Sequence, residues 1–271
     1  TNVIDRPALC IITPVSIDHE QFLGDTLAKI AAEKAGIIKP SVPCVVGPQP
    51  DEALEVIEAV AQRLQAPTFI YGQHWHVYEE RNRLVYQDER GLLDLPLPVL
   101  PGAHQIYNAG AALAALRHLD LPETGFEAAV TRAHWPARLQ RLKTGPLKDM
   151  APDADLWLDG GHNAAAGHAL ASHLAQQSLR PTYLICGMLN TKDVTGYLAP
   201  MAPYVAELLA VSIPSEANTL PAETTATAAK SVGMTATTAD TVNAAVVKIL
   251  KSDPASRILI CGSLYLAGQI L

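Results

Sequence analysis

The chain has 271 residues, of which 49% are hydrophobic, and it carries a formal net charge of -7. This length can bury two separate cores. The negative balance gives no electrostatic support for nucleic acid or an anionic membrane as a partner, so an anionic ligand would need locally placed cations. No apolar run approaches the roughly 20 residues that cross a bilayer, and the N-terminus has no signal-peptide pattern.

The cysteines of this chain lie far apart and form no CxxC pair, and each one sits inside or beside an apolar run that is typical of a strand. They are Cys10, Cys44, Cys186 and Cys261. This pattern predicts buried thiols in a reducing cytoplasm rather than disulfides or a metal site.

The first half of the chain predicts a mixed arrangement of strands and helices. In chain order we expect strands at 8–13, 43–47 and 68–72, helices at 25–37 and 51–65, an antiparallel ribbon at 76–87, and helices at 107–118 and 126–133. Asp25 or Thr26 can cap the first of these helices. The proline-rich run at 95–102 excludes a central strand there.

The second half alternates strands and helices with short connections. The expected strands are 156–159, 183–187, 207–213 and 257–262, and the expected helices are 164–177, 194–202, 221–232 and 239–251. This alternation predicts an α/β fold with a mostly parallel sheet covered on both faces. We place the domain boundary near 134–138, which divides the chain into residues 1–135 and 136–271.

Polar motifs follow three of the predicted strands of the second half. DGGHN occupies 159–163, GMLNTKD occupies 187–193, and Gly262-Ser263 follows the last strand. Ligands of open parallel sheets bind beyond the carboxyl ends of the strands. These motifs are therefore expected to line a common site.

Two further motifs lie near the N-terminus. SIDHEQFLG at 16–24 follows the first predicted strand, and EKAGI at 33–37 lies near the end of the helix that leaves the same loop. A loop imidazole at His19 could ligate a metal or hold an anion. The alternatives are a surface histidine and a solvated helix lysine at Lys34.

The pairing of SIDHxxFLG with AAEKAGI resembles the folylpolyglutamate and dihydrofolate synthases of the bifunctional type, relatives of the Mur peptide ligases. The resemblance implies the remainder of a P-loop-type Mur ligase central domain, followed by a Rossmann-like C-terminal domain. It also implies an ATP-dependent ligase of folate biosynthesis. Such an enzyme adds L-glutamate to dihydropteroate or folate polyglutamates through an acyl phosphate.

The same resemblance implies a metal site with catalytic roles for His19, Lys34 and Arg138. His19 would ligate Mg²⁺ near the ATP γ-phosphate, and Lys34 would be carbamylated. A lysine amine that adds carbon dioxide becomes an anionic oxygen donor of the kind that magnesium prefers.

Two motifs resemble the family's nucleotide-binding segments. In GAHQIYNA at 102–109, Asn108 is expected to hydrogen-bond adenine, although it could equally satisfy backbone groups in a helix turn. In PARLQ at 136–140, Arg138 is expected to contact ATP phosphates, or else to form a surface ion pair. Ala137 stands where the family usually has glycine.

The carboxyl-end motifs resemble the family's remaining binding segments. Asp159 is expected to face the nucleotide, and His162, Asn163 and Ser263 to contact the glutamate substrate. Capping of the following helix is a sufficient structural explanation for Asn163, and a turn hydroxyl for Ser263.

No GxxxxGK[ST] phosphate loop occurs in the chain, and its first residues, 1–4, match the end of a DATNVI segment that lies in mid-domain in this family. We therefore expect an N-terminally truncated piece, whose activity alone is in question because the phosphate loop is missing. We also expect a cytoplasmic, monomeric protein. ATP, a folate-type acid and glutamate would be its partners, with no nucleic acid or membrane. A Mur-type peptidoglycan ligase and a non-catalytic binding scaffold are the alternatives.

Overall fold

The computed structural model describes residues 2–18, 23–178 and 180–271. The chain divides into two compact units, Thr1–His134 and Trp135–Leu271, and each is described by itself. Within the described residues, no helix combines the length and the apolar character needed to cross a membrane. All four cysteines are buried free thiols, as the sequence predicts.

The first unit begins with a parallel sheet in the order β1-β2-β3. Its strands are β1 (Cys10–Ile12), β2 (Cys44–Val46) and β3 (Thr68–Ile70), and its helices are α2 (Leu27–Ala35) and α3 (Asp51–Arg63). Thr26 is the N-cap of α2, with its hydroxyl accepting from the Lys29 amide at 3.3 Å. The two helices bury small and branched residues, including Ile30 and Ile57, against the sheet.

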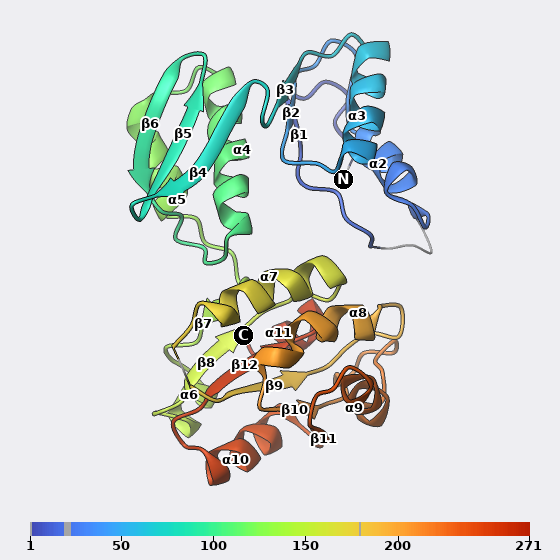
Figure 1. Ribbon diagram of the computed structural model, residues 1–271, viewed down its shortest axis with the longest axis vertical. Coiled ribbons are helices and arrows are strands. Elements are labelled where there is room, and N and C mark those ends of the chain that lie inside the picture. Colours follow the sequence, from blue (N-terminus) through green and yellow to red (C-terminus); the bar gives the residue numbers. More distant parts are fainter. Residues whose placement is uncertain (1, 19–22, 179) are drawn as a thin grey trace. The chain divides into compact units, whose positions relative to one another are not determined.

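An antiparallel meander completes the first unit (Figure 1). It consists of β4 (Trp75–Glu80), β5 (Arg83–Asp88) and β6 (Gly91–Pro96), followed by α4 (His104–His118), a short 3-10 turn (Glu123–Gly125) and α5 (Phe126–Thr131). Pro96 ends an edge strand, in agreement with the exclusion of a central strand there. Gly110 lets α4 approach the meander, because an added Cβ would lie 2.5 Å from Val77 Cγ1.

The second unit contains a six-stranded sheet in the order β11-β10-β9-β12-β8-β7. Its strands are β7 (Gln140–Arg141), β8 (Asp155–Leu158), β9 (Thr182–Cys186), β10 (Glu207–Ala210), β11 (Ala236–Thr238) and β12 (Arg257–Cys261). All pairings are parallel except that of β7 with β8. The sequence analysis does not predict the two edge strands, because β7 has only two residues and β11, with the sequence ATT, is not an apolar run.

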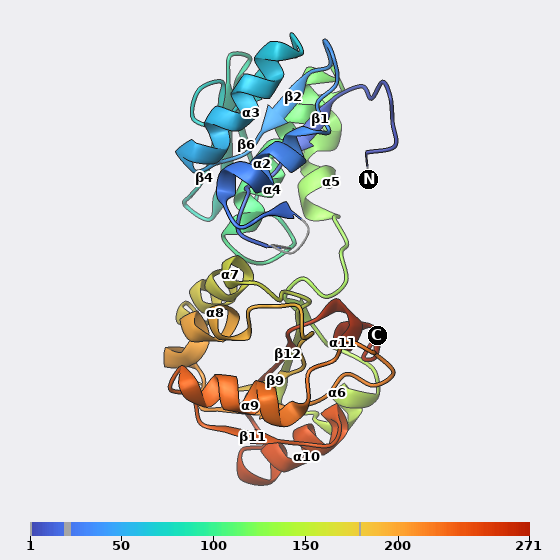
Figure 2. The same cartoon turned by 90° about the vertical axis from the view of Figure 1, so that its right-hand side faces the viewer.

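Helices cover both faces of this sheet, as predicted (Figure 2). One face packs against α6 (Pro146–Met150), α10 (Val242–Ser252) and α11 (Leu264–Gly268); the other packs against α7 (Ala164–Ala175), α8 (Val194–Leu198), the 3-10 helix Ala199–Tyr204 and α9 (Ala222–Ser231). Alternation along β12 divides its side chains between the two cores: Ile258 faces the first and Leu259 the second.

A close helix contact depends on Gly167 of α7. A Cβ at this position would lie 2.2 Å from the backbone oxygen of Tyr197. We expect Gly167→Ala to lower the free energy of unfolding of the second unit by about 2 kcal/mol, because backbone must move to admit the methyl group. Gly268→Ala is the matched control, since an added Cβ there meets no atom within 4 Å. Urea unfolding of both variants tests this, and equal midpoints would contradict it.

Candidate functional site

The carboxyl ends of β9, β12 and β8 lie side by side in the second unit, and the three polar motifs follow these ends. The Asp159 amide donates to the Ile260 carbonyl at 2.9 Å, which joins the first motif to β12. A Cβ on Gly160 would lie 2.2 Å from Leu264 Cδ2, and one on Gly262 would lie 2.7 Å from the Gly187 carbonyl oxygen. The turns are thus in direct contact, as the parallel sheet requires.

Asp159 is nearly buried, with 7% of its surface exposed. Its Oδ1 accepts from the Gly161 amide at 2.7 Å, and its Oδ2 accepts from the Leu139 amide at 2.8 Å. One carboxylate therefore ties the turn after β8 to the loop that precedes β7.

That loop presents Arg138 to solvent between two buried neighbours, Ala137 and Leu139. Both neighbours have positive φ angles, 55° and 45° respectively, which place them in the left-handed region. The Ala137 amide donates to Gln140 Oε1 at 2.9 Å, and its carbonyl accepts from the Gly160 amide at 2.9 Å. The arginine is exposed, but the backbone that carries it is held on both sides.

The remaining residues of the DGGHN motif shape the start of α7. The His162 ring contacts the Gly160 carbonyl through Nδ1 at 3.0 Å. Since a carbonyl can only accept, Nδ1 carries a proton in this arrangement. Asn163 is the N-cap of α7, and its side chain accepts from the Ala166 amide at 2.9 Å. Capping accounts for Asn163, whereas His162 lies half-buried at the turn.

Ser263 and Asp193 also cap helices. Ser263 is 2% exposed, and its hydroxyl oxygen accepts from the Tyr265 amide at 3.0 Å at the start of α11. Asp193 accepts from the Gly196 amide at 2.9 Å at the start of α8. A serine hydroxyl that accepts one bond still has a proton to donate.

The other predicted residues belong to the first unit. Lys34 is exposed in the last turn of α2, and His19 lies outside the described residues. Asn108 is exposed near the start of α4, where its amide donates to Gln105 Oε1 at 2.9 Å. In the part of the chain that the structure describes, no group of three or more His, Cys, Asp or Glu side chains could hold a metal ion.

A pocket of about 680 Å³ lies at the other end of α4, where Arg117 and His118 line it. None of the described residues predicted to form the site belongs to its lining. Arg117 is nine positions after Asn108, which is roughly 14 Å along a helix axis. This cavity is therefore distinct from the predicted adenine contact.

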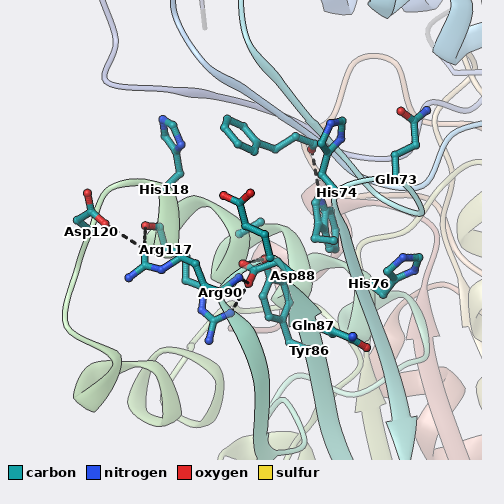
Figure 3. A pocket seen from close by; sticks show the side chains of 14 residues that line it. Gln73, His74, His76, Tyr86, Gln87, Asp88, Arg90, Arg117, His118 and Asp120 are labelled. Carbon is teal, nitrogen blue, oxygen red and sulfur yellow. Dashed lines mark hydrogen bonds and ion pairs between the residues drawn. The ribbon is translucent and has the colours of Figure 1, made fainter.

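Ion pairs form one side of this pocket (Figure 3). Arg117 is 4% exposed, pairs with Asp88, and reaches Glu123 at 2.9 Å; Arg90 pairs with the exposed Asp120 at 3.0 Å. A buried guanidinium needs such partners, because an unpaired buried charge is costly. The cluster is explained by the packing of α4 on the meander.

Comparison with known proteins decides the family. A model of the dihydrofolate synthetase C-terminal domain matches residues 144–271. The dihydrofolate synthase/folylpolyglutamate synthase of Mycobacterium tuberculosis is 35% identical over 75% of this chain, which covers 44% of that protein. The chain belongs to the folylpolyglutamate and dihydrofolate synthase family.

Solved structures of this synthase family have the same fold. Escherichia coli FolC in complex with DHPP and ADP matches 99% of this chain with a TM-score of 0.85 and 26% identity, and 61% of that chain is covered. A bifunctional folylpolyglutamate synthase/dihydrofolate synthase with Mn, AMPPNP and L-glutamate bound matches 99% with a TM-score of 0.83 and 26% identity, over 62% of its own length. The chain spans only part of the length of its curated relatives, between 32% and 66% for those with the strongest matches.

Sequence reasoning missed the groups that hold the Arg138 loop. Gln140 belongs to the PARLQ motif, in which only Arg138 is expected to act, and Asp159, which is expected to face the nucleotide, also accepts from two backbone amides. Two consecutive glycines after a strand-end aspartate are a signal for a turn held by that carboxylate. For Ala137 a signal exists in the glycine that the family usually has at this position, because glycine adopts positive φ readily. Leu139 has no such signal, because leucine does not favour the left-handed region.

Proposed function

We propose that this chain supplies the glutamate-ligation half of an ATP-dependent acid-amino-acid ligase, which joins L-glutamate to dihydropteroate or folate polyglutamates through an acyl phosphate. The observation that carries the proposal is the meeting of the Asp159–Asn163 turn, the Ser263 turn and the Arg138 loop at one edge of a parallel sheet. The relatives with ADP, AMPPNP and L-glutamate bound support the same substrates.

Arg138 is the proposed phosphate contact. An exposed guanidinium on an anchored backbone can pair bidentately with two phosphate oxygens. Charge that develops on the transferring phosphoryl group is stabilised by a donor already in place. Asn108, whose side chain has an NH₂ donor group and a carbonyl acceptor, is the proposed contact of the adenine base.

His162 and Ser263 are the proposed contacts of glutamate, together with the start of α7 that Asn163 caps. The Ser263 hydroxyl can donate to a carboxylate, and the backbone amides of a helix N-terminus favour negative charge. These residues would hold the amino acid so that its amine faces the acyl phosphate. The amine would then displace phosphate, and the new bond would be an amide.

A divalent ion belongs to this proposal, with His19 and a carbamate on Lys34 as its ligands. The bound Mn of the related structure supports a metal of this charge. Such an ion would neutralise the charge on the phosphates. The proposed compartment is the cytoplasm, where thiols stay reduced. The proposed oligomeric state is a monomer.

Two assays test the function. Calorimetry should detect binding of MgATP to this chain, and a fusion that places a phosphate loop ahead of it should incorporate labelled glutamate into dihydropteroate with release of ADP. UDP-muramyl substrates in the same assay should give no product. Product only with the muramyl substrates would favour a Mur-type ligase, and absence of any magnesium-dependent nucleotide binding in both polypeptides would favour a scaffold.

A further inference from the structure

The backbone on either side of Arg138 is held in an unfavourable conformation. A non-glycine residue in the left-handed region costs about 1–2 kcal/mol, and both Ala137 and Leu139 adopt it. Such a conformation persists only where surrounding contacts impose it. The position of Arg138 is therefore determined by tertiary contacts rather than by local preference.

The two neighbours of Arg138 are anchored in different cores. Ala137 packs in the core beneath α6, α10 and α11, whereas Leu139 packs in the core on the α7, α8 and α9 face of the sheet. Their exposed fractions are 2% and 3%. A residue between two such anchors can project only outward, as Arg138 does.

Two side-chain oxygens also accept hydrogen bonds from the backbone of this loop. Asp159 Oδ2 accepts from the Leu139 amide, and Gln140 Oε1 accepts from the Ala137 amide. The second oxygen of Asp159 accepts from Gly161, at the start of the turn that carries His162. One carboxylate thereby sets the distance between the proposed phosphate contact and the proposed glutamate contact.

We propose that Asp159 is a positioning residue, which acts on the nucleotide through the Arg138 loop and not by contact of its own. Gln140 supports it from the other side of the same loop. This inference rests on the proposed function, because it takes Arg138 as the phosphate contact.

A double-mutant cycle on the full chain tests the proposal. Asp159→Asn replaces one acceptor oxygen by an NH₂ group, so one of the two backbone bonds is lost. We expect MgATP affinity measured by calorimetry to fall about tenfold, which corresponds to loss of roughly 1.4 kcal/mol. In an Arg138→Ala background, the same substitution should change the affinity by less than about twofold.

Amide hydrogen exchange measured by NMR reads the loop directly. We expect exchange at Leu139 or Gly161 to rise at least about tenfold in Asp159→Asn. Unchanged exchange at both amides would overturn the proposal. So would an equal loss of affinity in the presence and absence of Arg138, which would indicate direct contact of Asp159 with the nucleotide.

Gln140 offers a pair of variants that does not alter Asp159. Gln140→Leu removes the acceptor oxygen for the Ala137 amide at similar volume, and Gln176→Leu makes the same change at an exposed glutamine of the second unit. We expect only Gln140→Leu to weaken MgATP binding, and equal affinities of the two variants would count against the role of Gln140 in holding the Arg138 loop. If Arg138→Ala alone leaves MgATP binding unchanged, then the proposed role of Arg138 fails, and that result differs from a failure of Asp159 coupling.

Discussion

Replacing Arg138 by alanine in a ligation-competent fusion is expected to reduce the rate of glutamate ligation by about a hundredfold, which is typical of removing one donor that stabilises transition-state charge. The guanidinium is exposed, so little stability should be lost with it. Arg138→Lys keeps the charge but not the two-pronged geometry, and an intermediate rate is expected.

The matched control is Arg180→Ala, which removes another exposed arginine of the same unit. Ligation rates under saturating and limiting ATP separate a binding defect from a defect in the chemical step. A ligation rate for Arg138→Ala equal to that of the control would show that Arg138 does not contribute to the site. Thermal unfolding of each variant shows whether the fold is kept.

Replacing Asp155 by asparagine should lower the free energy of unfolding of the second unit by about 3 kcal/mol at neutral pH. Asp155 lies 3.5 Å from Arg257 Nε and accepts from Arg141 Nε at 2.6 Å. Arg257 is 4% exposed, and the hydrogen bonds that it donates to the Ser178 and Thr182 hydroxyls are long at 3.4 Å. The substitution would leave a buried guanidinium without its counter-charge.

The loss of unfolding free energy caused by Asp155→Asn should become smaller as the pH falls. Burial acts to raise the pKa of Asp155, but hydrogen bonding and the charges of Arg141 and Arg257 outweigh it and lower the pKa below its ordinary value. A carboxylate with a depressed folded pKa contributes stability above its unfolded pKa of about 3.9 and loses that contribution as the pH falls through the folded pKa. The difference between wild type and Asp155→Asn should therefore be full at pH 7 and shrink below about pH 4.

Hydrogen exchange followed by mass spectrometry measures this difference in β8, β9 and β12, and so reads the second unit separately from the first. Asp149→Asn is the control, because Asp149 is an exposed carboxylate of the same unit. We expect that control to shift stability by less than about 0.5 kcal/mol. A gap that widens on acidification would contradict the assigned ion pair.

The long periodic segments were predictable because their patterns report burial directly. The four strands expected in the second half appear within a few residues of β8, β9, β10 and β12, and the expected helices appear as α7 to α10. The run predicted as a strand to Ile213 ends at Ala210, where β10 loses its partner β11. Two elements that were not predicted are β7, which has two residues, and α11, whose five residues are too few to show a helical period.

Among the candidate residues, the sequence alone determined which chemical groups follow which strands. Because a parallel sheet brings the carboxyl ends of its strands to one edge, the sequence also predicted that these groups lie together there. It also offered Asn163 as a cap, and Asp25 or Thr26 for the first helix, because a cap depends on the residues of one helical turn; the structure uses Asn163 and Thr26. Only the tertiary structure decided that Asp159 binds backbone amides and that Arg138 stands between two left-handed residues. Those features arise from contacts between segments distant in sequence, and such contacts override the local preferences that a sequence displays.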